Sequence, residues 1–118
     1  MMKLLIADDN TKVREMIKIV LSGFALDLLE CDNGYDAYQF FNEHRPDCIL
    51  MDIEMQPFDG LKATRLIKHS DSRAKVIIVT QHDTEDYRIQ AFNAGADGFV
   101  SKQNLPGLRT IIEKLIND

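Results

Sequence analysis

The chain has few cysteines, no long apolar run and no excess of positive charge. Each of these absences argues against a class of protein. Two cysteines allow at most one disulfide, so no disulfide framework holds the fold. No apolar stretch approaches the roughly 20 residues that a membrane-spanning helix needs. The net charge of −5, without any Lys or Arg cluster, argues against nucleic-acid binding by this chain. We therefore expect a cytoplasmic protein that binds neither membrane nor nucleic acid.

What is present is the composition of one globular domain. The chain is 118 residues long, with 45% hydrophobic and 28% charged residues, which is enough for one core and too short for two. Cys31 and Cys48 lie in apolar stretches, where a free cysteine is typically a small core residue. The sequence shows no internal repeat, linker or low-complexity stretch. We predict a single domain over residues 1–118.

Short apolar runs alternate with stretches of helical periodicity along the whole chain. The predicted strands are residues 4–7, 25–31, 48–51, 76–80 and 99–101. The first predicted helix starts at Asn10 or Thr11 and carries apolar residues at helical spacing up to Leu21. The others end before Pro46, start at Asp59-Gly60, run from Asp83 or Thr84 to Gly95, and start near Pro106. Residues 103–107 read as a loop.

Five strand–helix units in sequence indicate a parallel sheet covered by helices on both faces. The strands are near-continuous apolar runs, as is typical of buried parallel strands. Right-handed crossovers leave few topologies. We therefore predict an α/β fold of the flavodoxin-like (βα)5 type, a doubly wound sheet with strand order 2-1-3-4-5.

Polar side chains stand where the predicted strands end. Asp8 and Asp9 follow the first strand, Asp52 ends the third, Thr80 ends the fourth and Lys102 ends the fifth. The carboxyl ends of parallel strands share one edge of the sheet, so these groups should converge there. Three crowded carboxylates repel one another unless a cation compensates. A hard divalent cation suits oxygen ligands, and Mg²⁺ fits best because it takes few carboxylates and leaves positions for phosphate oxygens.

The hydroxyl and the ammonium complete a site for a tetrahedral oxyanion. Thr80, Lys102 and a bound Mg²⁺ would neutralise and orient the oxygens of a transferring phosphoryl group. A carboxylate at the centre of this arrangement can act as a nucleophile and form an acyl phosphate. Asp52 is the best candidate, because it stands on a central strand among the other groups.

The same residues resemble a known family. The acidic pair Asp8-Asp9, the segment DIEMQPFDG from Asp52 to Gly60, Thr80, and GFVSK ending at Lys102 occur in the order found in receiver domains of bacterial two-component response regulators. The resemblance covers essentially the full length. It implies that Asp52 receives phosphate from a sensor histidine kinase or a histidine phosphotransfer protein.

The resemblance also implies roles for the surrounding residues. Mg²⁺ would be held by Asp9 and Asp52 directly, by Asp8 through a water, and by the backbone carbonyl of Glu54. Thr80 and Lys102 would contact the phosphoryl group, and Thr80 would move toward it when it arrives. Phe99 would be the second switch residue, turning as Thr80 moves. The only chemistry expected is phosphorylation and dephosphorylation of Asp52 itself, so the chain is not expected to be an enzyme.

The resemblance further suggests how a signal would leave the domain. The fourth helix, the fifth strand and the last helix form a face that the family commonly uses for dimerisation or partner binding. The stretch from His82 to Lys102 is similar to receivers joined to a LuxR-type helix-turn-helix domain, which favours control of transcription through an output domain outside this chain. The alternative is a stand-alone receiver that acts by binding proteins.

Three positions depart from the family pattern. The loop proline, Pro57, stands one position later than is common, and Gln56 takes its place. Lys102 is followed by Gln103 rather than proline, so we expect no cis bond there. Phe99 occupies a position where tyrosine is common, so its ring lacks the hydroxyl that would bond from an outward position.

Other interpretations of these residues stay open at this point. Asp8 and Asp9 are also compatible with a charge pair favoured at a helix N-terminus, and Phe99 with a plain core residue. His82 and Glu54 flank the site, where they would touch the water that hydrolyses an acyl phosphate.

Three other functions share parts of this pattern. A flavodoxin-like electron carrier needs a hydroxyl- and glycine-rich loop after the first strand, whereas this loop is acidic. A haloacid-dehalogenase-type phosphatase needs a D-x-D-x-T pattern that neither aspartate segment offers. The third is a receiver-shaped module that is never phosphorylated.

Overall fold

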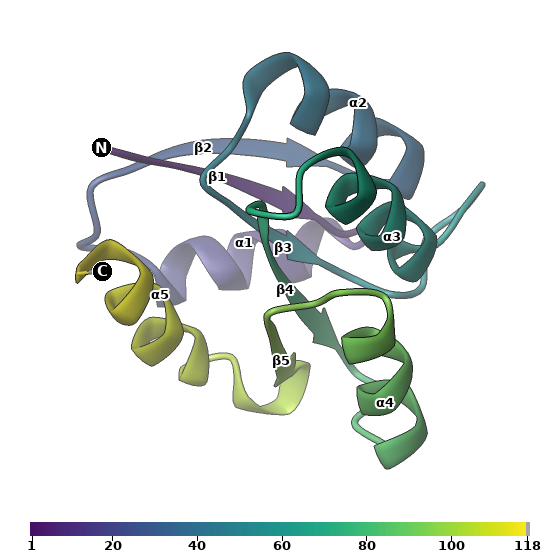
Figure 1. Cartoon of the computed structure of the whole chain (residues 1–118). Helices are drawn as coiled ribbons and strands as arrows, with labels where there is room; N and C mark the ends of the chain where they lie inside the picture. The colour runs from purple at the N-terminus through teal and green to yellow at the C-terminus, as the bar shows by residue number, and fades with distance from the viewer. Residues whose placement is uncertain (118) are drawn as a thin grey trace.

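A five-stranded parallel sheet organises the chain in the computed structural model, which describes residues 1–117. The strand order is β2-β1-β3-β4-β5, with all neighbours parallel, so the predicted flavodoxin-like order 2-1-3-4-5 is confirmed (Figure 1). Residue 118, the last of the predicted domain, lies outside the described residues. None of the described helices has the length and apolar character needed to cross a membrane.

Strands and helices alternate along the whole chain, as the periodicity predicted. The strands are β1 (Met2–Ala7), β2 (Leu26–Cys31), β3 (Cys48–Met51), β4 (Lys75–Thr80) and β5 (Gly98–Ser101). The helices are α1 (Thr11–Val20), α2 (Gly34–His44), α3 (Gly60–Ser70), α4 (Glu85–Asn93) and α5 (Gly107–Asn117). A short 3-10 helix, η1 (Lys102–Asn104), joins β5 to α5.

Side-chain caps fix where the helices begin at the carboxyl end of the sheet. Asn10 accepts the backbone N–H groups of Lys12 and Val13 and is therefore the N-cap of α1, which decides between Asn10 and Thr11. Thr84 accepts the N–H of Tyr87 at 3.2 Å and caps α4 in the same way. Asn33 caps α2 and Asp59 caps α3. These caps set the distance between each strand end and the helix that follows it.

The prediction was wrong in two details of the last third of the chain. The region from residue 102, predicted as a strand end and a loop, begins with η1, because the Ser101 hydroxyl accepts the N–H of Gln103 and turns the backbone. Helix α4 ends at Asn93 rather than at Gly95. Gly95 has a φ of +103°, a left-handed conformation that glycine adopts easily and that stops the helix.

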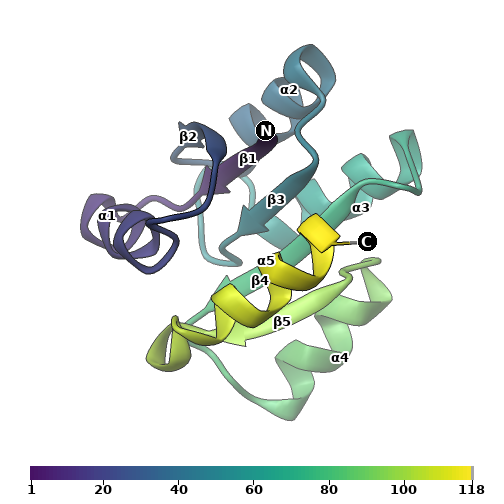
Figure 2. The ribbon, with the colours of Figure 1, turned by 90° about the vertical axis from the view of Figure 1, so that its left-hand side faces the viewer.

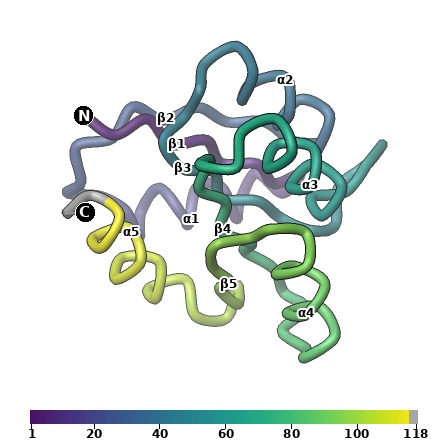
Figure 3. Tube along the Cα trace, viewed as in Figure 1, coloured from purple at the N-terminus to yellow at the C-terminus, as the bar shows by residue number. Residues whose placement is uncertain are grey.

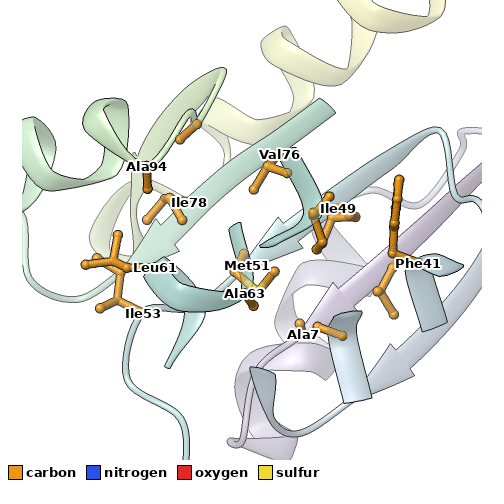
Figure 4. Close-up of a cluster of buried hydrophobic side chains, with 14 of the residues drawn as sticks. Ala7, Phe41, Ile49, Met51, Ile53, Leu61, Ala63, Val76, Ile78 and Ala94 are labelled. Atoms are coloured by element: carbon orange, nitrogen blue, oxygen red, sulfur yellow. The ribbon is translucent and has the colours of Figure 1, made fainter. Parts of the chain in front are cut away.

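The hydrophobic core has two parts, one on each face of the sheet. Helices α1 and α5 cover one face, and Figure 2 shows α5 lying across β4 and β5. Helices α2, α3 and α4 cover the other face, where Phe41 of α2 lies beside Ile49 of β3 and Leu61 of α3 lies beside Ile78 of β4 (Figure 4). With both faces covered, the central strands β1, β3 and β4 are almost wholly apolar, as predicted.

Both cysteines are core residues, as predicted. Cys31 and Cys48 are buried free thiols. Burial raises the pKa of each thiol to about 12, so neither forms a reactive thiolate near neutral pH.

Candidate functional site

The register of the sheet brings the ends of β1 and β3 level. Ala7 pairs with Met51, so the next residues, Asp8 and Asp52, emerge side by side at the carboxyl edge. The backbone ladder continues one step beyond the strands, since the N–H of Asp52 donates to the carbonyl of Ala7 at 2.9 Å. The positions of these two aspartates therefore follow from strand pairing rather than from a flexible loop.

Three carboxylates gather at this edge. One oxygen each from Asp8, Asp9 and Asp52 lies within 4.8 Å of the others. Asp8 is 2% exposed and Asp52 is 3% exposed, whereas Asp9 is exposed. Two buried negative charges this close together require compensation by positive charge or by protons.

Lys102 supplies part of this compensation. Its ammonium lies 2.8 Å from Oδ2 of Asp8 and 3.3 Å from Oδ1 of Asp52. Burial lowers the pKa of Lys102, but contact with Asp8 and the negative charge of Asp52 outweigh burial and raise the pKa overall. The lysine is therefore charged at neutral pH, and one cation faces three carboxylates.

The excess of negative charge over positive charge affects the pKa of Asp52. Burial, followed by the negative charge of Asp8, raises the pKa of Asp52 to about 6, against the opposing effect of Lys102. Metal-ion binding would relieve this cost, because a second cation would favour the ionised carboxylate.

The donor set fits a hard divalent cation such as Mg²⁺. Oδ2 of Asp8 is buried, and the Lys102 ammonium beside it, 2.8 Å away, is shared with Asp52. Within residues 1–117 the Asp9 side chain makes neither a hydrogen bond nor an ion pair, so its oxygens are available. Oxygen ligands with unfilled bonding capacity, together with excess negative charge, are what Mg²⁺ and its bound waters require.

A cavity of about 590 Å³ opens over the carboxylates. Asp9, Asp52 and Lys102 line it on the sheet side. Glu54 and Gln56 line it from the loop between β3 and α3, which projects from the body of the protein in Figure 3. The predicted metal ligand, the Glu54 carbonyl, therefore belongs to a segment that borders the same cavity.

Thr80 takes a different position from the other predicted site residues. It is fully buried at the end of β4 and is not among the residues that line the cavity. Its hydroxyl oxygen accepts the backbone N–H of His82 at 3.2 Å. A hydroxyl that accepts one hydrogen bond can still donate its own proton, so Thr80 keeps a donor for an oxyanion bound nearby.

His82 and Glu54 meet beside the cavity. Nε2 of His82 contacts Oε1 of Glu54, and the His82 ring stacks on Tyr87 with centroids 5.3 Å apart. The sequence placed both residues next to the site but gave no sign of this contact. It links the loop after β3 to the first turns of α4.

Phe99 is half-buried on β5 and packs against the core on the α4 side of the sheet. The guanidinium of Arg88, on α4, lies 4.7 Å from the centre of the Phe99 ring. Arg88 is also paired with Asp83 at 2.8 Å. Phe99 is thus a contact between β5 and α4 rather than a fully enclosed core residue.

Two residues that hold Asp8 in place could not be identified in this role from the sequence. Arg14 donates to the backbone carbonyl of Asp8 at 2.6 Å, and the N–H of Asn10 donates to Oδ1 of Asp8 at 2.9 Å. Asn10 was recognised only as a helix cap, and no motif marks Arg14. Both hold Asp8 in place.

The peptide bond after Lys102 was expected to be trans, because Gln103 rather than proline follows this lysine. Among the described residues the only cis bond precedes Pro57, so the bond between Lys102 and Gln103 is trans, as predicted.

Comparison with known proteins places this fold and site in a family. Residues 4–114 match the family described as the response regulator receiver domain. The chain belongs to this family. It is similar to the chemotaxis protein CheY of Bacillus subtilis, with 37% identity over 85% of this chain and 84% of that protein. It is also similar to the oxygen regulatory protein NreC of Staphylococcus haemolyticus, with 36% identity over 93% of this chain and 54% of that protein.

A solved structure supports the same assignment. A DNA-binding response regulator of the LuxR family from Staphylococcus aureus superposes with a TM-score of 0.88 and 29% identity, covering 98% of each chain. The chain is therefore a receiver domain of a two-component system, which is a signalling domain rather than a classical enzyme. It spans most of CheY but about half of NreC.

Proposed function

We propose that Asp52 is the phosphoacceptor of this receiver and takes its phosphoryl group from a sensor histidine kinase or a histidine phosphotransfer protein. The observation that carries the proposal is the position of the Asp52 carboxylate, at the bottom of the cavity and 3.3 Å from Lys102. A carboxylate oxygen of Asp52 would attack phosphorus as the bond from phosphorus to the donor histidine nitrogen breaks. The product is an acyl phosphate on Asp52.

The proposed metal is Mg²⁺, held by Asp9, Asp52 and the Glu54 carbonyl, with Asp8 acting through a water. When bound, it would offset the charge of the carboxylates and of the incoming phosphoryl oxygens. Asp8 keeps Lys102 in position, since the ammonium lies 2.8 Å from its Oδ2. Lys102 would then move the short distance toward Asp52 and bind a phosphoryl oxygen.

Thr80 and Phe99 are the proposed switch. The Thr80 hydroxyl would move toward the phosphoryl group and donate its O–H to a phosphoryl oxygen, and its movement would leave space beside β5 into which the Phe99 ring turns. A two-state element responds to a ligand only when the ligand interacts differently with the two states, and this hydroxyl supplies the difference.

The proposed output surface is formed by α4, β5 and α5. Ile89 and Phe92 on α4 are 51% and 52% exposed, and such side chains suit a dimer or partner contact better than free solvent. The likeness to NreC and to the LuxR-family regulator favours control of transcription through an output domain, working in the cytoplasm. The likeness to CheY favours the alternative, a stand-alone receiver that binds a protein partner.

Phosphorylation is tested directly by mass. With Mg²⁺ present, acetyl phosphate or phosphoramidate should add one phosphoryl group to the wild-type chain and none to Asp52→Asn. Asp27→Asn, on the exposed part of edge strand β2, is the matched control and should be modified like the wild type. Equal modification of wild type and Asp52→Asn would overturn the assignment.

A further inference from the structure

The first turn of α2 is tied to the loop that follows Asp52. The N–H of Gly34 donates to the carbonyl of Phe58 at 3.2 Å. Next to it, the rings of Tyr35 and Phe58 meet edge to face, with centroids 5.9 Å apart and an angle of 87° between their planes. The far end of the loop after β3 is therefore fixed by a helix that contributes no residue to the cavity.

Gly34 lies so close to this loop that it has no room for a side chain. A Cβ at position 34 would lie 2.5 Å from the carbonyl oxygen of Phe58 and 2.8 Å from that of Asp59. Both atoms belong to the backbone, so neither can give way by a change of side-chain rotamer. Any added atom at Gly34 must displace the backbone of the loop.

A second glycine continues the contact to Asp52. Gly60 follows Asp59, and a Cβ at Gly60 would overlap the backbone carbonyl of Asp52. The N–H of Gly60 also donates to the carbonyl of Ile53 at 2.9 Å, which closes the loop on itself. A displacement of Phe58 and Asp59 would therefore also displace Gly60, and with it the backbone of Asp52 and Ile53.

We infer that Gly34 is a positioning residue for the acidic site and that α2 sets its metal affinity through the contacts from Gly34 to Phe58 and from Gly60 to Asp52. The inference rests on the proposed Mg²⁺ site and deepens it. Metal coordination is sensitive to small shifts of its ligands, because Mg²⁺ demands near-ideal octahedral geometry. Asp52 and the Glu54 carbonyl both lie on the segment that Gly34 holds.

The inference predicts a loss of metal affinity without the loss of any ligand. Gly34→Ala should weaken Mg²⁺ binding about tenfold, the lower end of the effect of removing a group that supports a metal ligand. The matched control is Gly98→Ala on β5, because a Cβ there would meet Ile77 at an ordinary 3.5 Å. This control should bind Mg²⁺ like the wild type.

The experiment is a calorimetric Mg²⁺ titration of the folded wild type, Gly34→Ala and Gly98→Ala, with the stability of each measured by urea unfolding in EDTA. A merely structural role for Gly34 would lower stability and leave the Mg²⁺ dissociation constant of the folded protein unchanged, and that result overturns the inference. Amide shifts of residues 52–60 in the metal-free variant should differ from the wild type if the loop has moved.

A second variant keeps the inference testable if Gly34→Ala does not fold. Phe58→Ala leaves the backbone hydrogen bond but removes the ring that holds the loop against Tyr35, so it should also weaken Mg²⁺ binding, whereas Phe58→Tyr should not. Unchanged affinity in Phe58→Ala would then reject the inference. Absence of Mg²⁺ binding by the wild type would instead reject the proposed metal site.

Discussion

Lys102 lies closer to Asp8 than to Asp52, with its ammonium 2.8 Å from Oδ2 of Asp8 and 3.3 Å from Oδ1 of Asp52. The other oxygen of Asp8 accepts the N–H of Asn10. Both oxygens of Asp8 thus have a neighbouring positive or donor group, whereas the Asp9 carboxylate is exposed. We therefore propose different tasks for the adjacent aspartates, Asp8 in holding Lys102 and Asp9 in binding a cation from the cavity.

This division predicts the order of two metal titrations. Asp9→Ala should weaken Mg²⁺ binding more than Asp8→Ala does, because in the proposed site Asp9 would be a direct ligand and Asp8 would act through a water. We expect a loss of at least about tenfold for Asp9→Ala. Calorimetric titration at constant ionic strength measures both, with Asp27→Ala as the control for the loss of one negative charge. A larger effect of Asp8→Ala would reverse the assignment of the two residues.

The raised pKa of Asp52 predicts a pH-dependent cost to folding in the absence of metal. An unfolded aspartate titrates near pH 4, and burial beside Asp8 raises the pKa of Asp52 to about 6 in the folded protein. Between these values the folded state binds the extra proton, so stability should fall as the pH rises from about 4 to about 6. The full shift corresponds to a cost of about 3 kcal/mol above pH 6.

Asp52→Asn removes this titration and should be more stable than the wild type at pH 7 in EDTA. The difference should shrink as the pH falls and become small below about pH 4, where Asp52 is protonated in both the folded and the unfolded wild type. Urea unfolding at each pH gives the comparison, and Asp27→Asn is the control. A difference between wild type and Asp52→Asn that is the same at pH 4 and pH 7 would contradict the prediction.

The sequence predicted the positions of residues at strand ends correctly, but it did not predict the contacts that loops make with distant segments. Asp8, Asp52 and Thr80 were placed correctly at strand ends, because apolar runs mark the strands and parallel strands end at one edge. The contacts of Gly34 with Phe58 and of His82 with Glu54 were not foreseen. Each joins a loop to a segment far away in the sequence, and its geometry depends on backbone paths that no periodic pattern encodes.

At the opposite end of the sheet, the half-buried Lys68 joins three segments. Nζ of Lys68 lies 2.8 Å from Oδ2 of Asp97 and donates to the carbonyl of Ala74. The same Asp97 oxygen accepts the N–H of Val76 at the start of β4. The Lys68 and Asp97 side chains are 15% and 32% exposed, so solvent screens this pair somewhat less than a pair between two fully exposed side chains.

We expect Lys68→Met to lower the free energy of unfolding by about 2 kcal/mol, because Asp97 and the carbonyl of Ala74 both lose the ammonium that contacts them. Lys18→Met is the matched control. Lys18 pairs with Glu15 and Glu30 on the more exposed surface of α1, where such pairs contribute about 1 kcal/mol or less. Urea unfolding at neutral pH measures both, and a Lys18→Met loss equal to that of Lys68→Met would reject the distinction.

The switch can be separated from the chemistry at Thr80. The Thr80 hydroxyl accepts the backbone N–H of His82, and Thr80 does not line the cavity. We therefore expect that the attack by Asp52 does not require Thr80. Thr80→Ala should therefore still accept phosphate on Asp52, as seen by intact mass. It should lose most of the structural response of α4, β5 and α5. Alanine cannot donate a hydrogen bond to the phosphoryl oxygen, so phosphorylation would no longer favour the moved position of this residue.

Amide chemical shifts with a beryllofluoride mimic of the acyl phosphate decide this prediction. In the wild type, residues 84–117 should shift on binding, with the Phe99 ring leaving the guanidinium of Arg88, which now lies 4.7 Å from its centre. Thr80→Ser keeps the hydroxyl and should respond like the wild type. If residues 84–117 shift as much in Thr80→Ala, the signal leaves Asp52 by a route other than Thr80. The contact of Glu54 with His82 is one other link from the site to α4.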